Sequence, residues 1–424
     1  MEVKILETTV VLPSPPPPFQ VDHHLPLSHL DNDRNLHVTF RYLRAYVATN
    51  DHPTTTTDPF HVITAALSAA LHHYYPFAGT LRRREDNRLE LHCQAGKGVP
   101  VIRASVDCTL ESVNYLDDPA ETWIENLVPD PDPEKGLANP MVLQVTGFAC
   151  GGYCLGAMVH HAMCDGLGAT QFFNGVAELA RGASRLSVEP VWDRARLLGP
   201  REPPRVEFPV HEFLGLDEGF SPYSASGEPV VRECFHVKEE WLDQLKRVKA
   251  SGTPGDEQVK FAYATNIRKL LNPPLPSGYW GNGCVAMYAQ TTAKDLVHQP
   301  IWSTAELIKK SKRNSTDQYV RSFIDFQELH FAEGITAGKG VSGFTDWRHL
   351  GHSTVDFGWG GPVTVLPLSR HLLGSVEPCF FLPYSSAKGG SKDGFKVLVY
   401  LRESAVEGFR EDMAKFSRQE FDLV

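Results

Sequence analysis

Several features that define other protein classes are missing from this sequence of 424 residues. No stretch approaches the roughly 20 apolar residues that a membrane-spanning helix needs. The first 11 residues are a charged, strand-like run followed by proline-rich sequence, which is not the pattern of a secretory signal. The 41 Lys and Arg are outnumbered by 51 Asp and Glu, so the chain lacks the basic surplus typical of nucleic-acid-binding proteins.

The cysteines show no structural pattern. Eight are scattered along the chain, and no two of them form a CxxC pair. A disulfide framework or a zinc ribbon would show regularly spaced cysteines. We therefore expect reduced thiols, no metal site, and a cytoplasmic protein that binds neither nucleic acid nor membranes.

The composition that is present is that of a globular protein. Hydrophobic residues make up 42% of the chain and charged residues 22%, which leaves ample apolar surface for a core. At roughly 150 residues per domain, the length predicts two or three domains or one large split fold.

Strand-like and helix-like patterns alternate, which predicts an α/β fold with mixed sheets. Asp58-Pro59 has the form of a helix N-cap followed by proline, and the helical spacing of apolar residues then continues to Pro76. Asp118-Pro119 predicts the start of a second helix. Strands are expected over 142–148, 153–159, 259–267 and 395–401, and helices over 167–181, around 241–248, from near 303, and over 406–416.

The regular pattern stops between Ala183 and about Pro229, where seven prolines interrupt the sequence. A structureless stretch of this length is unusual inside a compact domain, so we interpret it as a crossover between two domains. The expected organisation is an N-terminal domain over 1–185, a linker over 186–229 and a C-terminal domain over 230–424.

The segment HHAMCDG at 160–166 is the richest in reactive side chains. At the two-residue period of a strand, His160 and His161 face opposite sides and cannot both point into one site. One of them could be a general base, because a strand end that meets a helix start is a common place for catalytic groups. The strand geometry argues against a metal site with Asp165, and nothing in the sequence indicates the low thiol pKa that a Cys164 nucleophile needs. Two ordinary histidines at a strand end are the alternative that local spacing alone favours.

A second unusual segment is DFGWGGP at 356–362, which combines glycines that allow sharp turns with large aromatic rings. HAMCD at 161–165 and DFGWG at 356–360 match, in order and separation, the HxxxD and DFGWG motifs of the plant BAHD acyltransferases. The sequence resembles this family over nearly its whole length. The resemblance also covers segments at 25–31, 74–79, 96–99, 144–148 and 278–282.

The resemblance implies a fold of two chloramphenicol-acetyltransferase-like α/β domains with mixed sheets, joined by the long crossover loop, with a solvent channel between them. It implies that His161 is the catalytic base, a role that suits a neutral histidine at cytosolic pH. Thr345 and Trp347 match the family's T-x-W motif. Thr345 is the candidate donor to the oxyanion, and Trp347 is either a wall of the acceptor pocket or a core residue.

The other matched residues are expected to be structural. The resemblance implies that Asp165 turns away from His161 and pairs with Arg268. The segment 278–282 is expected near the coenzyme A side of the channel. The DFGWG residues expected to shape a loop beside the channel are Asp356, Gly358, Trp359 and Gly360.

The implied activity is transfer of an acyl group from acyl-CoA, a co-substrate, with no bound cofactor. The expected acyl group is benzoyl, hydroxycinnamoyl or acetyl, and the expected acceptor is the hydroxyl of a plant specialised metabolite. One alternative is N-acylation of an amine or polyamine. A non-catalytic relative that binds a ligand or a partner is the alternative from another class. Because family members are mostly monomeric, we expect a monomer.

The sequence departs from the family at one place. In other family members, the helix that corresponds to residues 241–248 is followed by a second helix with a Trp-Arg pair midway. Here the nine residues 249–257 run directly into the next strand, and they are too few and too polar for a long helix. We expect that this helix is missing, that coenzyme A binding is weakened, and that an apolar patch is exposed.

Overall fold

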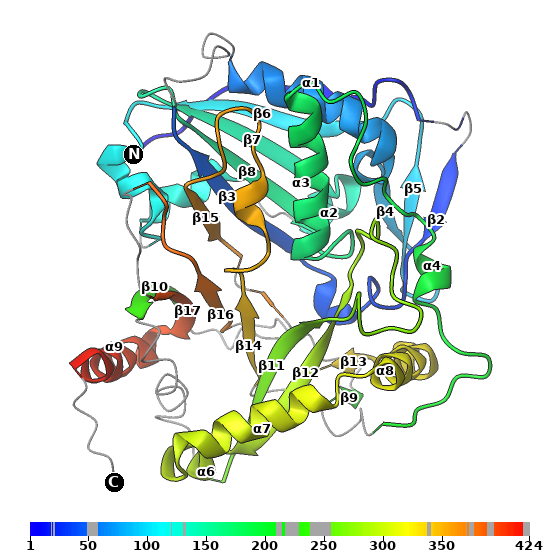
Figure 1. Cartoon of the computed structure of the whole chain (residues 1–424), viewed down its shortest axis with the longest axis vertical. Coiled ribbons are helices and arrows are strands. Elements are labelled where there is room, and N and C mark those ends of the chain that lie inside the picture. The colour runs from blue at the N-terminus through cyan, green and yellow to red at the C-terminus, as the bar shows by residue number, and fades with distance from the viewer. Residues whose placement is uncertain are drawn as a thin grey trace.

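The computed structural model contains two six-stranded sheets, which lie one above the other in the view of Figure 1. N-terminal residues, blue to green, form most of the upper sheet and its helices, and residues after 230 form the lower sheet. The residues that the structure describes are 1–17, 19, 22–48, 58–119, 121–129, 133–208, 214–216, 229–237, 256–336, 341–369, 371–372, 377–387 and 394–418.

The first sheet has the strand order β1-β6-β7-β8-β3-β15, in which only β6 and β7 are parallel neighbours. Its strands are β1 (Lys4–Val11), β3 (Thr39–Tyr46), β6 (Val99–Val106), β7 (Met141–Phe148), β8 (Tyr153–His160) and β15 (Thr364–Pro367). Helices α1 (Pro59–His73) and α3 (Gly166–Ala180) pack together over one face (Figure 1). Every residue of β8 is buried, so the strand that leads into the 160–166 segment lies in the core.

The second sheet has the order β10-β17-β16-β14-β11-β12, with β14 parallel to both β11 and β16. Its strands are β10 (Val230–Val237), β11 (Gln258–Asn266), β12 (Cys284–Thr292), β14 (Val341–Asp346), β16 (Cys379–Leu382) and β17 (Phe395–Arg402). Helix α7 (Ile301–Arg313) packs on β12, and α9 (Glu403–Arg418) packs on β10 and β17. Both sheets are therefore mixed, as the sequence predicts.

Smaller elements surround these sheets. They are the strands β2 (His23–Pro26), β4 (Thr80–Arg83), β5 (Leu89–Cys93), β9 (Gly215–Leu216) and β13 (Ile335–Thr336), and the helices α2 (Pro133–Ala138), α4 (Arg194–Leu197), α6 (Ala293–His298) and α8 (Asp317–His330). Within the described ranges, no helix is long and apolar enough to cross a membrane.

Strand β15 joins the C-terminal half of the sequence to the first sheet. It comes from the C-terminal half of the sequence, yet it pairs antiparallel with β3 of the first sheet, with Thr364 opposite Ala45 and Pro367 opposite Tyr42. In Figure 1 the segment from β14 to β15 rises from the lower sheet to the upper one. Backbone hydrogen bonds therefore join residues more than 300 positions apart.

Most of the expected elements are present within a few residues of their predicted bounds. Helix α1 begins as predicted, because the Asp58 side chain accepts a hydrogen bond from the backbone N–H of Phe60 at 2.9 Å and Pro59 occupies the first helical position. The strands predicted over 142–148, 153–159, 259–267 and 395–401 are β7, β8, β11 and β17.

The helix predicted to start at Asp118-Pro119 is wrong in type and start. The structure has a six-residue 3₁₀ helix over Thr122–Leu127, with no side-chain cap. The chain returns to an extended conformation at Val128, which leaves no room for a longer α-helix. Packing rather than helix propensity decides this segment, because the apolar residues that suggested a helix are all buried: Trp123, Ile124 and Leu127.

Parts of two other predictions fall outside the described residues. The helix around 241–248 and nearly all of the segment 249–257 lie there, so the missing helix stays a prediction. Of the predicted crossover 186–229, the described part contains the short helix α4 and strand β9. It packs against the segment 278–282, because the N–H of Val191 donates to the carbonyl of Gly278 at 2.9 Å.

The close approach of α3 to Trp280 generates a stability prediction. A Cβ at Gly168, in the first turn of α3, would lie 2.0 Å from the backbone carbonyl oxygen of Trp280. Gly168→Ala should therefore push the two segments apart and destabilise the fold by about 1–3 kcal/mol. The measurement is the free energy of unfolding from denaturant titration.

Gly408→Ala is the matched control, since Gly408 lies on the exposed side of α9 and its Cβ would meet no atom within 4 Å. This change should leave stability equal or slightly higher, because Ala favours a helix over Gly. Equal unfolding free energies for the two variants would contradict the close approach at Gly168.

Candidate functional site

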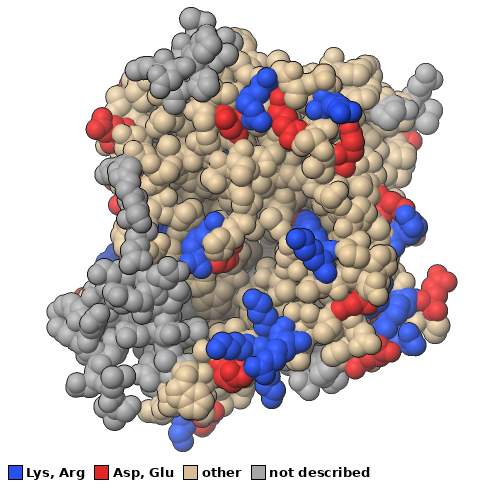
Figure 2. Space-filling view, viewed as in Figure 1, with Lys and Arg blue, Asp and Glu red and all other residues tan. Residues whose placement is uncertain are grey.

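A cavity of about 220 Å³ lies where the two sheets meet. Its wall combines residues from both halves of the chain, within 30–42, 159–169, 264–288 and 345–352, together with Leu372. Figure 2 shows the surface hollowed between the upper and lower halves of the molecule, with Lys and Arg side chains around the rim. Residues far apart in sequence therefore converge on one enclosed space.

His161 lies in the wall of this cavity and His160 does not. Strand β8 ends at His160, which is buried on the other side and accepts a hydrogen bond from the N–H of Ala162 at 3.3 Å through its Nδ1 atom. Burial lowers the pKa of His160 to about 3. The opposite orientations predicted for the two histidines are thus present in the structure.

The backbone of His161 is held from two sides. Its N–H donates to the carbonyl of Val38 at 2.8 Å, and its carbonyl accepts from the Nδ2 of Asn282 at 2.8 Å. Asn282 is itself fixed by the buried carboxylate of Asp31, which accepts from its backbone N–H and from its Nδ2, both at 2.9 Å. Three segments distant in sequence therefore fix the position of one histidine.

The imidazole of His161 is only partly enclosed by protein. Its ring stands edge-on to Phe40 with 6.0 Å between the ring centroids, and its Nδ1 atom has no hydrogen-bond partner among the described residues. Burial lowers its pKa below 6.5, although the negative charge of Asp165 and nearby hydrogen bonds oppose that shift. The histidine is therefore neutral at pH 7 and able to accept a proton.

Asp165 does not orient His161, because its carboxylate is fully engaged elsewhere. It forms two hydrogen bonds with Arg268, at 2.8 and 2.9 Å, so the expected ion pair is present. The N–H groups of Gly168 and Gly283 also donate to it, at 2.8 and 2.9 Å. Burial alone would raise the pKa of Asp165, but these partners lower it to about 2. The carboxylate thus caps α3 and ties it to β11 and β12.

Cys164 also lines the cavity, but its thiol is not prepared for nucleophilic attack. Burial and the neighbouring charge of Asp165 raise its pKa well above the ordinary value, so the reactive thiolate is not available. Among the described residues, no group of three or more His, Cys, Asp or Glu side chains is arranged to hold a metal ion.

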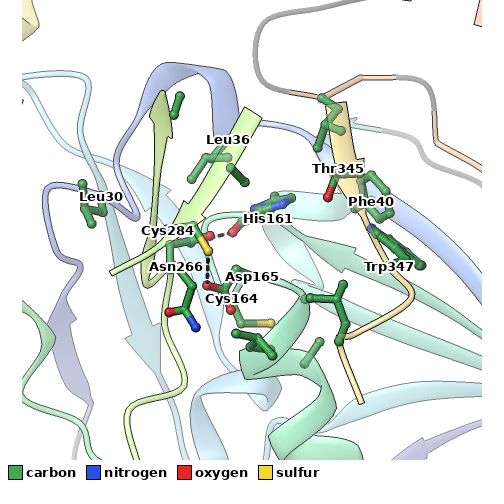
Figure 3. Close-up of a pocket in the computed structure, with 18 of the residues that line it drawn as sticks. Leu30, Leu36, Phe40, His161, Cys164, Asp165, Asn266, Cys284, Thr345 and Trp347 are labelled. Atoms are coloured by element: carbon green, nitrogen blue, oxygen red, sulfur yellow. Dashed lines mark hydrogen bonds between the residues drawn. The ribbon is translucent and has the colours of Figure 1, made fainter. Parts of the chain in front are cut away.

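Thr345 and Trp347 lie on the far side of the cavity from Cys284. Figure 3 shows His161 between Cys284 on one side and Thr345, Phe40 and Trp347 on the other. Trp347 is only 8% exposed, and its ring centroid lies 4.9 to 6.0 Å from those of its aromatic neighbours. These neighbours are Phe40, Tyr42, His352 and Phe380. Trp347 is therefore both a packed core residue and a wall of the cavity.

The DFGWG segment contributes no residue to the described wall of the cavity. The Asp356 carboxylate accepts hydrogen bonds from the N–H groups of Gly358 and Gly360, at 2.7 and 2.8 Å, and both glycines have positive φ angles. Trp359 packs edge-on against Tyr153 of β8, with 5.6 Å between ring centroids. The segment forms a rigid turn that leads into β15, so it shapes the cavity only indirectly.

Sequence reasoning missed several residues of the site. Phe40 and Tyr42 on β3 line the cavity, as does His352, and none of them was singled out. The period-two pattern of β3 is the only sequence signal for the first two. His352 follows a left-handed turn at Gly351, and nothing local in the sequence marks it as a cavity residue.

The Asp165–Arg268 pair generates a prediction about stability. Asp165→Ala leaves the Arg268 guanidinium, whose side chain is 16% exposed, without its carboxylate partner. Removing one partner of a buried pair costs about 3–5 kcal/mol, so the melting temperature should fall substantially. Asp165→Asn keeps the shape and a hydrogen-bond acceptor and should lose less.

The exposed ion pair between Glu306 and Arg313 provides the control. Glu306→Ala should leave the melting temperature unchanged within error, because exposed pairs contribute little. A melting temperature for Asp165→Ala equal to that of Glu306→Ala would show that the buried pair does not hold the fold.

Known structures resemble this chain over almost its whole length. Vinorine synthase matches with a TM-score of 0.67 and 21% identity, covering 96% of each chain. F. graminearum TRI101, in complex with coenzyme A and deoxynivalenol, matches with a TM-score of 0.75 and 14% identity, covering 92% of this chain and 98% of the other. These likenesses show that the chain has the two-domain α/β fold expected from the sequence.

Similar sequences cover the chain equally well. Taxadien-5-alpha-ol O-acetyltransferase of Taxus cuspidata is 33% identical over 97% of this chain and 96% of its own length. 3'-N-debenzoyl-2'-deoxytaxol N-benzoyltransferase of Taxus canadensis is 32% identical over 94% of this chain and 92% of its own length. Fatty alcohol:caffeoyl-CoA acyltransferase of Arabidopsis thaliana is 34% identical over 91% of this chain and 92% of its own length.

The model of the Transferase family matches residues 1–224 and 244–416, which is most of the chain. Together with relatives more than 30% identical along nearly the whole sequence, this match shows that the chain belongs to the BAHD family of acyl-CoA-dependent acyltransferases.

Proposed function

We propose that this protein transfers an acyl group from an acyl-CoA thioester to the hydroxyl of a small plant metabolite, with His161 as the general base. The observation that carries the proposal is a neutral, half-buried histidine in the wall of an otherwise largely apolar cavity between the two sheets. Such cavities with a few polar groups are typical ligand sites. The Lys and Arg side chains around the hollow suit the phosphates of coenzyme A (Figure 2).

The proposed reaction needs one proton acceptor and one oxyanion donor. His161 takes the proton from the acceptor hydroxyl as its oxygen attacks the thioester carbonyl carbon. The carbonyl oxygen becomes negatively charged, and the hydroxyl of Thr345, which lies on the His161 side of β14 in Figure 3, is our candidate donor to it. Collapse of the tetrahedral intermediate breaks the carbon–sulfur bond, and the departing thiolate receives the proton from His161.

We also infer the organisation and setting of this enzyme. Residues 1–185 and 230–424 would form two acyltransferase domains joined by 186–229, with the cavity at their junction. Strand β15 is the exception, because it comes from the second of these segments and belongs to the sheet of the first. The eight cysteines are all free thiols, which supports a reducing compartment such as the cytoplasm. A monomer suffices for this chemistry, because both halves of the cavity wall come from one chain.

The alternative acceptor is an amine. Three relatives support it, since the Taxus canadensis relative is named an N-benzoyltransferase and two Arabidopsis thaliana relatives are named spermidine acyltransferases. A neutral base in the same place could also accept a proton from an attacking amine. The two acceptors differ in charge, because an alcohol enters the cavity neutral and an alkyl amine arrives mainly as a cation.

The function is tested with acetyl-CoA, benzoyl-CoA and hydroxycinnamoyl-CoA, each combined with alcohols and polyamines. Release of free coenzyme A thiol that depends on both substrates, together with acylated products in the mass spectrum, is the expected result. His161→Ala should lower kcat by about 10²- to 10⁴-fold, the usual contribution of a general base. Absence of thiol release with every pair would indicate a protein that only binds ligands.

His160→Ala is the matched control for this prediction. His160 is buried outside the cavity wall, so its removal should lower the melting temperature and leave kcat within a few fold of the wild type. A folded His161→Ala variant with wild-type kcat would rule out His161 as the base.

The pH dependence follows from the lowered pKa of His161. A histidine with a lowered pKa stays neutral to lower pH, so the acid limb of kcat/KM should have an apparent pKa below 6.5. The charge of Asp165 raises the pKa of His161, so Asp165→Asn should move this limb to still lower pH. An acid limb above pH 6.5, or a shift upward in the Asn variant, would contradict this assignment.

A further inference from the structure

A buried arginine without a carboxylate partner lies behind one wall of the cavity. Arg44 on β3 is fully buried, with its guanidinium carbon 4.5 Å from the ring centroid of Phe173 and 5.0 Å from that of Tyr42. It forms no ion pair with any described residue, and its Nε and Nη1 have no hydrogen-bond partner among them. Since a buried charge is normally paired, this uncompensated one calls for an explanation.

The hydrogen bond that Arg44 does form fixes the state of His352. The Nη2 of Arg44 lies 3.1 Å from the Nδ1 of His352. A guanidinium can only donate, so this Nδ1 must carry a lone pair, and the hydrogen of the neutral ring is on Nε2. Thr170 also lies 3.3 Å from Nδ1, but its hydroxyl donates to the carbonyl of Gly166 at 2.9 Å.

His352 stands between Arg44 and the cavity. His352 is in the cavity wall, whereas Arg44 is not. Because Nδ1 is turned toward Arg44, the Nε2–H group is on the opposite edge of the ring, where it is buried within the cavity wall and has no hydrogen-bond partner among the described residues. Buried N–H groups are satisfied with few exceptions, so an unpaired one in a ligand cavity is suited to meet an acceptor atom of the ligand.

The protonation state of His352 is stable. Burial lowers its pKa well below 6.5, and the positive charge of Arg44 lowers it further. The adjacent wall is made by Tyr42, Leu350 and Trp347, the last with its ring centroid 4.9 Å from that of His352. This part of the cavity thus combines the Nε2–H group of His352 with the hydroxyl of Tyr42, which also lacks a hydrogen-bond partner among the described residues. The rest of this wall is aromatic and aliphatic, and the charge of Arg44 lies behind it.

We propose that His352 donates a hydrogen bond through Nε2 to an oxygen of the acceptor other than the reacting hydroxyl, and that Arg44 holds it in this form. Arg44 is then a positioning residue, and its unpaired charge disfavours an ammonium group nearby, because charges inside a protein are weakly screened. The acceptor class is an alcohol that carries a carbonyl, ether or second hydroxyl oxygen, and not a polyamine. This inference rests on the proposed acyl transfer.

Three benzyl alcohols of nearly equal size separate these effects. They carry an ethyl, a methoxy or an aminomethyl group at ring position 3 or 4, so they differ in having no acceptor, an acceptor oxygen or a cation. With acetyl-CoA or benzoyl-CoA as donor, kcat/KM for the better methoxy compound should exceed that of its ethyl analogue by about 3- to 10-fold, the range of one net hydrogen bond. The aminomethyl compound should be the poorest of the three.

Variants of the two residues test the assignment. His352→Phe keeps a ring but removes the donor, so the methoxy-to-ethyl ratio should fall to about 1. In His352→Gln the amide oxygen can accept from Arg44 while the amide N–H donates to the ligand, so much of the ratio should return. Arg44→Gln removes the charge and should raise the aminomethyl-to-ethyl ratio.

His92→Phe is the matched control, because His92 is buried on β5 and is outside the cavity wall. It should leave both ratios unchanged even if the protein becomes less stable. If Arg44→Gln does not fold, the two His352 variants still decide the question.

Two results would overturn the proposal: a wild type without preference for methoxy over ethyl, or a His352→Phe variant that keeps the preference. If no pair of substrates is turned over, the proposed acyl transfer itself fails. The same three alcohols are then compared by their dissociation constants from calorimetry. Equal affinities for the methoxy and ethyl compounds in the wild type would overturn the role of His352 as well.

Discussion

The buried carboxylate of Asp165 is the point on which the rest of the site depends. It accepts hydrogen bonds from Arg268, from the first turn of α3 at Gly168 and from Gly283 before β12. A buried charge is tolerated only when its partners are in place, so these three segments must assemble together. His161 precedes Asp165 by four residues, and the turn between strand and helix is therefore fixed by an interaction that spans both halves of the chain.

A second set of contacts acts on His161 more directly. Asp31 holds Asn282, and Asn282 holds the carbonyl of His161. These bonds act on the backbone and leave the imidazole free to meet a substrate. In the proposed mechanism, positioning and proton transfer are thus assigned to different atoms, and a carboxylate beside the histidine is not needed to orient it. The pKa of His161 agrees with this division of roles. Burial lowers this pKa by more than the charge of Asp165 raises it, so Asp165 is not the main influence on the imidazole.

Local patterns in the sequence predicted much of the fold, and long-range contacts explain where they failed. The alternation in β8 was enough to separate His160 from His161, and the cap at Asp58 was enough to place α1. The segment at 118–127 has helical spacing, but its packing allows only a 3₁₀ turn. The pairing of β15 with β3 joins residues more than 300 positions apart and has no periodic signal. The same holds for the contact of Arg44 with His352, which required the folded structure.

Two arginines near the cavity, Arg44 fully buried and Arg268 partly buried, differ in how their charge is compensated. Arg268 is paired with the carboxylate of Asp165, so the two charges nearly cancel at a distance. This pair stabilises the fold. No described carboxylate matches Arg44, so its field reaches the cavity through His352. Packing on two aromatic rings recovers part of the cost of burying this charge. In the proposed complex, an acceptor oxygen bonded to His352 interacts favourably with this charge. A buried charge left unpaired in this way reduces stability in the empty protein and favours one class of ligand in the complex.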